Sequence, residues 1–133
     1  MTLLYCVDNN NGLMFNGRRQ SRDKVLLARI LERTKESRLW VVPYSAKLFG
    51  SEAHIQVAED PVTRAGEGEF CFVEDWDPGL CQSLPEQVIR FCWNRDYPAD
   101  LWCTLDLTQY TLTQTEEFAG SSHEKITEEI FTR

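Results

Sequence analysis

Four basic side chains and one carboxylate lie close together in the amino-terminal part of the chain. The cations are Arg18, Arg19, Arg22 and Lys24, and the carboxylate is Asp23. Guanidinium groups bind a phosphate or carboxylate through paired hydrogen bonds, and a carboxyl group in an apolar cleft has a raised pKa that suits a general acid. Structural alternatives exist for both: an Asp that offsets the dipole in the first turn of a helix, and a solvated basic loop face.

Histidine and cysteine offer weaker candidate sites. His123 lies in residues 120–125, where Ser, His and Glu could act as nucleophile, base and orienting acid, but adjacent residues rarely converge in that geometry. A polar hairpin loop is the favoured interpretation there, and His54 is expected to be a structural histidine in a strand. The five cysteines contain no CxxC pair, which predicts reduced thiols and no metal site: Cys6, Cys71, Cys81, Cys92 and Cys103.

Short apolar runs bounded by turn residues predict strands around one long helix. The helix is expected from a cap at Ser21 to about Lys35, with Asp23 in its first turn and with Arg29 and Arg33 facing water. Strand, helix and strand in this order predict parallel pairing, and two alternating strands at the end predict antiparallel pairing. Strands are expected at residues 3–8, 38–42, 53–58, 70–73, 87–93, 108–115 and 126–132, helical turns at 45–49 and 77–84, and loops at 9–20, 59–69 and 116–125.

Composition predicts one acidic globular domain spanning residues 1–133. The 42% apolar and 26% charged residues are ordinary for a folded protein, and neither a membrane span nor a signal peptide is visible, which predicts a cytoplasmic location. The net charge of −7 is uneven, because residues 1–50 carry +5 and the remainder −12. The acidic remainder argues against nucleic acid as a partner, whereas the basic part could meet an anionic ligand.

Two segments resemble dihydrofolate reductase. Residues 7–17, Val-Asp-Asn-Asn-Asn-Gly-Leu-Met-Phe-Asn-Gly, look like the first strand and glycine-rich loop of that family, and residues 97–106 look like its Gly-Asp-x-x-Phe-Pro segment. The resemblance implies an α/β fold with a mainly parallel central sheet, flanking helices and antiparallel C-terminal strands. It also implies that Asp23 is the helix-borne catalytic acid. Ligand contacts are expected from Cys6, Asp8, Gly12, Leu13, Met14, Arg18, Arg19, Arg22 and Tyr44.

The departures from that family concern the cofactor. Pro43-Tyr44 stands where the family has Gly-Arg, which removes a positive charge and a backbone donor. Glu74-Asp75 stands where a diglycine admits the cofactor pyrophosphate, and like charges about 4 Å apart repel by on the order of 4 kcal/mol at an effective dielectric of about 20. The connection over residues 59–69 is also too short for the part of the family that holds adenosine. No cofactor is therefore expected.

Four functions remain as hypotheses. The leading one is a small-ligand-binding or regulatory protein that has lost NADPH binding. The alternative is an active NADPH-dependent reductase of a pterin or related heteroaromatic substrate, with Asp23 as its acid. A third is an interaction module that forms a homodimer through a sheet edge near residues 53–58. A hydrolase that uses His123 is the most distant.

Overall fold

The computed structural model describes all residues from Met1 to Arg133. Its helices and strands agree with most of the expected segments to within one or two residues. In chain order the elements are β1 (Thr2–Val7), β2 (Gly12–Phe15), β3 (Arg18–Arg19), α1 (Lys24–Thr34), β4 (Leu39–Val41), α2 (Pro43–Ala46), β5 (Ile55–Val57), α3 (Pro61–Arg64), β6 (Phe70–Phe72), the 3-10 turn η1 (Pro78–Leu80), β7 (Gln87–Cys92), β8 (Leu101–Trp102), the 3-10 turn η2 (Leu107–Gln109), β9 (Thr111–Phe118) and β10 (Ile126–Thr132).

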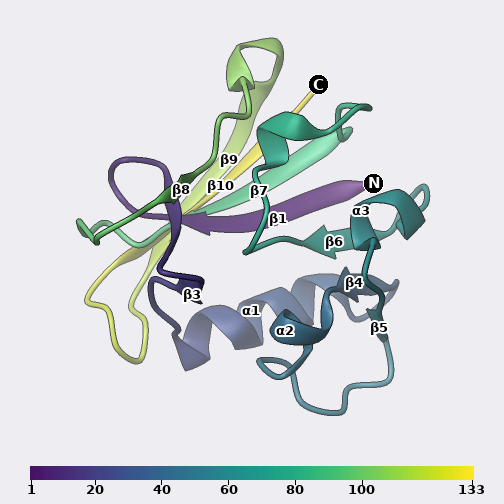
Figure 1. The fold of residues 1–133 in the computed structure, drawn as a ribbon, viewed down its shortest axis with the longest axis horizontal. Coiled ribbons are helices and arrows are strands. Elements are labelled where there is room, and N and C mark those ends of the chain that lie inside the picture. The colour runs from purple at the N-terminus through teal and green to yellow at the C-terminus, as the bar shows by residue number, and fades with distance from the viewer.

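A seven-stranded sheet with the order β5-β4-β6-β1-β7-β10-β9 forms the centre of the molecule (Figure 1). Strand β1 pairs in parallel with both β6 and β7, and β10 pairs antiparallel with β7 and β9. The predicted fold class, a mainly parallel sheet with an antiparallel carboxyl-terminal end, is confirmed. Strands β5 and β9 are the two edges of this sheet.

Alternation along β1 divides the core into two layers. Leu4 points to the face covered by α1, where it packs with Leu26 and Ile30 of that helix. Leu3 and Tyr5 point to the other face. Figure 1 shows α1 along one side of the sheet and the connection from β6 to β7 on the other. This two-sided burial is typical of parallel strands, and it fixes the positions of the strand ends where the candidate site lies.

Helix α1 binds the sheet through charge as well as apolar packing. Arg29 and Arg33 were expected to face water, but both donate hydrogen bonds to the carboxylate of Glu128 on β10, which is 1% exposed. Arg29 also contacts Glu116 of β9 at 2.7 Å. A buried carboxylate needs such partners, because burial without compensation would be costly.

Other predicted boundaries need correction. The expected loop at 9–20 contains β2 and β3, which pair with each other, and β2 also pairs with β8, so the three strands form a small separate sheet. The helical turn expected at 45–49 begins at Pro43, where proline is favoured in a first helical turn, and the expected loop at 59–69 contains α3. Strand β9 begins at Thr111 and extends through Phe118, because its pairing with β10 continues into the expected loop. The helix or turn expected at 77–84 is reduced to η1.

No helix of the structure is both long enough and apolar enough to span a membrane.

Candidate functional site

An ion pair closes the space between the ends of β3 and β6. Arg19 Nε donates to Glu74 Oε1 at 2.8 Å and Arg19 Nη2 donates to Glu74 Oε2 at 3.0 Å, a bidentate geometry. Ser45 Oγ of α2 donates to the same carboxylate at 2.6 Å. The Arg19 guanidinium also lies 4.3 Å over the ring of Tyr44, whose hydroxyl accepts from Arg19 N. The side chain of Glu74 thus ties three elements together.

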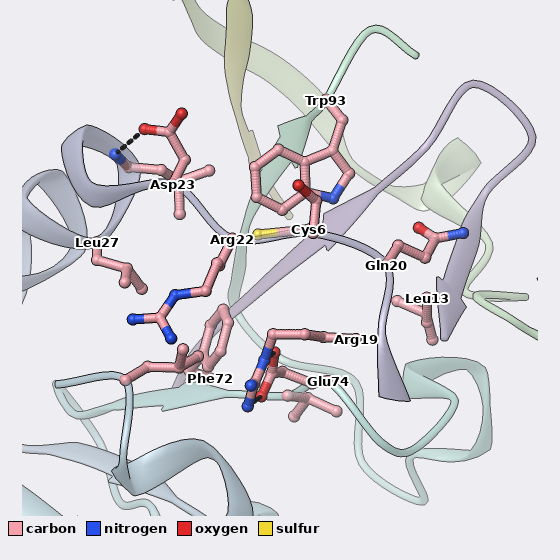
Figure 2. Close-up of a pocket in the computed structure, with 14 residues that line it drawn as sticks. Cys6, Leu13, Arg19, Gln20, Arg22, Asp23, Leu27, Phe72, Glu74 and Trp93 are labelled. Carbon is pink, nitrogen blue, oxygen red and sulfur yellow. Dashed lines mark hydrogen bonds and ion pairs between the residues drawn. The ribbon is translucent and has the colours of Figure 1, made fainter. Parts of the chain in front are cut away.

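This ion pair forms one wall of a cleft, shown in Figure 2, that lies between the carboxyl ends of β1 and β6 and the amino-terminal end of α1. The free space inside the cleft is only ≈ 20 Å³, which is about enough for one water molecule. Of the predicted site residues, the structure brings five to the cleft wall: the predicted ligand contacts Cys6, Leu13, Arg19 and Arg22, and the predicted acid Asp23.

The carboxylate of Asp23 is almost fully buried and is the N-cap of α1. It was expected in the first turn, with Ser21 as the cap. Asp23 Oδ1 accepts from Val25 N and Leu26 N of the helix, and two backbone N–H groups of the β9–β10 loop, Ser121 N and Ser122 N, donate to the same carboxylate at 3.0 and 2.8 Å. Each donor favours the ionised form.

The expected raised pKa of Asp23 is therefore wrong. Burial alone would raise the pKa of this carboxyl, but the backbone hydrogen bonds from Ser122 and Ser121 and the bond from His123 outweigh burial and hold the pKa well below its usual range. An ionised Asp23 is an acceptor and a structural cap. It has no proton to donate to a substrate near neutral pH.

His123 lies in the hairpin loop between β9 and β10, as expected, but its side chain is buried against this cap. Its Nδ1 lies 3.0 Å from Asp23 Oδ2, its Nε2 lies 3.1 Å from Ser21 Oγ and 3.0 Å from Tyr97 Oη, and its ring stacks on Trp93 at a centroid distance of 4.5 Å. Serine, histidine and aspartate in this order resemble a nucleophile with its base and orienting acid. Tyr97 shares His123 Nε2 with Ser21, and backbone N–H groups of α1 and the β9–β10 loop hold Asp23, so we interpret the cluster as a clamp between α1 and this loop.

The remaining predicted ligand residues lie away from the cleft wall. Asp8 is buried and anchors its own loop by accepting from the backbone of Asn10, Gly12 and Tyr97. Gly12 has no room for a side chain, because a Cβ would lie 2.8 Å from that of Ala99. Met14 is buried in the opposite core layer, and Arg18 is exposed. Tyr44 lies against the guanidinium of Arg19.

The cysteines are neutral thiols in this structure. All five are free, and burial raises the pKa of Cys6 well above its ordinary value, with the charge of Glu74 adding to the effect. A thiol that resists ionisation is a poor nucleophile and a poor metal ligand. No group of His, Cys, Asp and Glu in the structure has the arrangement of a metal site. Asp23 and His123 come from segments 100 residues apart, so no local sequence pattern could have joined them.

Comparisons with known proteins agree on the fold alone. No protein-family model and no curated protein matches the chain. Among solved structures, dihydrofolate reductase from Enterococcus faecalis, in a complex with NADP(H) and RAB-propyl, superposes with a TM-score of 0.69 over 99% of this chain and 95% of that chain. The chain has a dihydrofolate reductase-like fold. The two sequences are only 10% identical, so this fold is built here with almost entirely different residues.

Glu74 and Asp75, which stand where the dihydrofolate reductase family has a diglycine, were expected to repel a pyrophosphate through their negative charges. Arg19 compensates the charge of Glu74, and the Glu74 side chain bridges neighbouring elements. Asp75 is exposed and forms no ion pair, so its negative charge remains uncompensated. The two neighbouring carboxylates differ in environment although they stand together in the sequence.

Proposed function

We propose that this protein is a divergent dihydrofolate reductase-like binding protein that does not use NADPH and acts through a bound ligand or partner. The observation that carries the proposal is the Glu74 side chain at the carboxyl end of β6. Where the resemblance expects a diglycine, a carboxylate held by Arg19 and Ser45 occupies the space next to the backbone. A dinucleotide pyrophosphate would have to displace this ion pair and approach the unpaired charge of Asp75.

Two further features support the same proposal over the reductase alternative. The free space of ≈ 20 Å³ is far below the roughly 300 Å³ or more of ordinary small-molecule sites, so no pterin or nicotinamide ring fits without rearrangement. Asp23, the only carboxyl group that the resemblance offers as a proton donor, has a lowered pKa and accepts hydrogen bonds from the backbone of α1 and of the β9–β10 loop. The cleft therefore offers neither the space for a heteroaromatic ring nor a protonated acid for its reduction.

The decisive experiment is an isothermal titration of the protein with NADPH, with a dihydrofolate reductase titrated in parallel as a positive control. We expect no saturable heat from this protein and no NADPH oxidation when dihydrofolate is added. Saturable binding of NADPH would overturn the proposal. Turnover that disappears in a folded Asp23→Asn variant would establish the reductase instead.

Arg22 is the part of the cleft that can meet a small anionic or heteroaromatic ligand. Its guanidinium forms no ion pair, and Figure 2 shows it directed across the cleft mouth toward Leu27 and Phe72. Arg22 is exposed, so its planar cation at the cleft mouth suits a small aromatic carboxylate that stays outside the closed interior, where no ring fits. We expect benzoate to raise the melting temperature and the Arg22→Ala variant to lose that rise. The matched control is Arg18→Ala, which removes an exposed arginine that does not line the cleft. An equal rise in both variants would place the anion elsewhere.

A homodimer through a sheet edge remains part of the proposal. Residues 53–58 do contain an edge strand, β5, but it pairs over only three residues. The opposite edge, β9, is longer and exposed along most of its length, a feature that the sequence did not reveal. Unpaired strand edges invite pairing with another chain. Light scattering is expected to show a dimer as concentration rises through the micromolar range, and a monomer throughout would contradict edge pairing.

A further inference from the structure

A second hollow, which we call the acidic groove, lies on the face of the sheet away from α1. Its volume is ≈ 830 Å³. The chain crosses from β6 over β1 to β7 through residues 73–86, which form only the 3-10 turn η1 (Figure 1). Parallel crossovers ordinarily place an α-helix on the sheet at such a point. Because that helix is lacking, this part of the sheet is incompletely covered.

The floor and one wall of the acidic groove are apolar. Val62 comes from α3, and Trp76 and Leu80 come from the crossover, whereas Phe72 and Val73 at the end of β6 also line the groove but are almost fully buried. Val62 and Trp76 pack against the core layer of this face, whereas Leu80 is 64% exposed. An apolar surface of this kind can bind the apolar side chains of another molecule and exclude water from them.

The charged side chains on the rim of the acidic groove are all negative, and the α-amino group of Met1 is the one positive group among the lining residues. The 21 lining residues contain no Lys, Arg or His, but they do contain five carboxylates: Glu59, Asp60, Glu67, Asp75 and Glu86. Among them only Asp60 forms an ion pair, with Arg64 at 3.0 Å on the exposed surface. A hollow with low-dielectric walls and charges of one sign concentrates its field and attracts the opposite sign. This rim therefore favours a cation and repels phosphate.

The carboxylates are distributed along the acidic groove and not gathered at one point. Glu86 and Met1 stand before the amino ends of β7 and β1, whereas Asp75 follows the carboxyl end of β6. One ammonium group could neutralise only one end of such an arrangement. Several cations at intervals, with apolar groups between them, would match the rim and floor together. A peptide has this geometry, because successive side chains of an extended strand point to opposite sides.

We propose that the acidic groove binds a basic, amphipathic peptide segment of a partner protein. Apolar side chains of the segment contact Trp76 and Leu80, and its Lys or Arg side chains contact the rim carboxylates. The inference rests on the proposed function, because a binding protein needs a surface for its partner. It also goes further than the proposed function, because it names the site and the chemistry of the occupant.

The test is fluorescence anisotropy with a short labelled peptide that alternates arginine and leucine. The unmodified protein is expected to bind it, with affinity that falls as salt rises. Asp75→Lys and Glu67→Lys, both on the rim, are each expected to weaken binding by about tenfold. The matched control is Glu36→Lys, which makes the same charge change at an exposed residue just after α1, on the other face of the sheet. Leu80→Ser tests the apolar wall and should not endanger the fold, because Leu80 is exposed.

Several outcomes would overturn the inference. Equal weakening by Asp75→Lys and Glu36→Lys would mean that only net charge matters. Binding of a glutamate–leucine peptide with similar affinity would remove the role of the rim, and unchanged binding by Leu80→Ser would remove that of the wall. Full displacement of the peptide by spermine at equal concentration would identify a small-polyamine site instead. The NADPH titration is a separate measurement, so a groove that binds no peptide leaves the proposed function standing.

Discussion

The cleft and the acidic groove share the end of β6 and differ in almost every other respect. The cleft is bridged by an arginine and has ≈ 20 Å³ of free space, whereas the groove has no basic lining residue and measures ≈ 830 Å³. Consecutive residues separate them, since Glu74 lines the cleft and Asp75 lines the groove. The chain bends at residues 74–76, just after β6, and the two neighbouring carboxylates there face different hollows. The paired carboxylate of Glu74 closes the cleft, and the unpaired carboxylate of Asp75 adds negative charge to the acidic groove.

The same contrast accounts for the uneven charge of the chain. Arg19, Arg29 and Arg33 belong to the basic first fifty residues, and each one is paired with a carboxylate inside the protein. Much of the positive end is therefore neutralised by the fold. The groove carboxylates, from residues 59–86, have received almost no such partners. Negative charge is left where it faces solvent and an incoming cation.

Removal of the Asp23 carboxylate should have the largest effect on stability. Asp23→Ala deletes an N-cap and leaves several buried donors without an acceptor, so we expect the free energy of unfolding to fall by at least about 3 kcal/mol. Asp75→Ala, the groove-side control, should change it by less than about 0.5 kcal/mol. Urea denaturation followed by circular dichroism measures both. Similar effects of the two changes would contradict the contrast between the regions.

The pH dependence of stability should come from the cleft side. The pKa of Asp23 in the folded protein lies below that of an unfolded Asp, about 3.9, so its stabilisation is complete above that value and is lost as pH falls toward the folded pKa. From about pH 5 to about pH 3 we expect Asp23 to contribute a loss of about 1 kcal/mol. Urea melts across this range should show a smaller loss in Asp23→Asn. The Asp75→Asn control should keep the full acid dependence, and a slope altered equally in both variants would refute the assignment.

The sequence predicted the strands and the order of the elements well, because buried runs such as 70–73 and 87–93 have local signatures. It could not predict contacts between distant segments. Arg29 and Arg33 have the spacing of a solvated helix face, and only the approach of the buried Glu128 from β10 turns these partly exposed arginines into its partners. The five cleft residues could be expected from a resemblance, but the closure by Arg19 and Glu74 could not. Pro78-Gly79 indicated a short turn. The size of the acidic groove could not be predicted, because it depends on the lack of a helix over this part of the sheet.

Loss of the closing ion pair should have an intermediate effect. Glu74→Gln keeps the shape of the side chain but removes the charge that faces Arg19 and Ser45, and we expect a loss of about 1 to 2 kcal/mol. The cost is limited because Arg19 is 21% exposed and can regain water. Urea denaturation measures this loss, and Glu117→Gln, which removes a carboxylate from a solvent-exposed ion pair with Lys125, is the control with a smaller expected effect. An unchanged or raised stability in Glu74→Gln would show that the ion pair does not hold the cleft closed.

The smallest effect should have the opposite sign and concern the next residue. Asp75→Asn removes an unpaired charge from a rim that also contains Glu59, Glu67 and Glu86, so repulsion within the folded protein decreases. We expect a gain of up to about 0.5 kcal/mol that shrinks as salt screens the remaining charges. Thermal melts at low and high salt measure it, with Asp96→Asn, an exposed aspartate outside the groove, as the control. A loss of stability in Asp75→Asn would mean that Asp75 has a cationic partner, and the groove would then lack the uncompensated charge that recruits a basic segment.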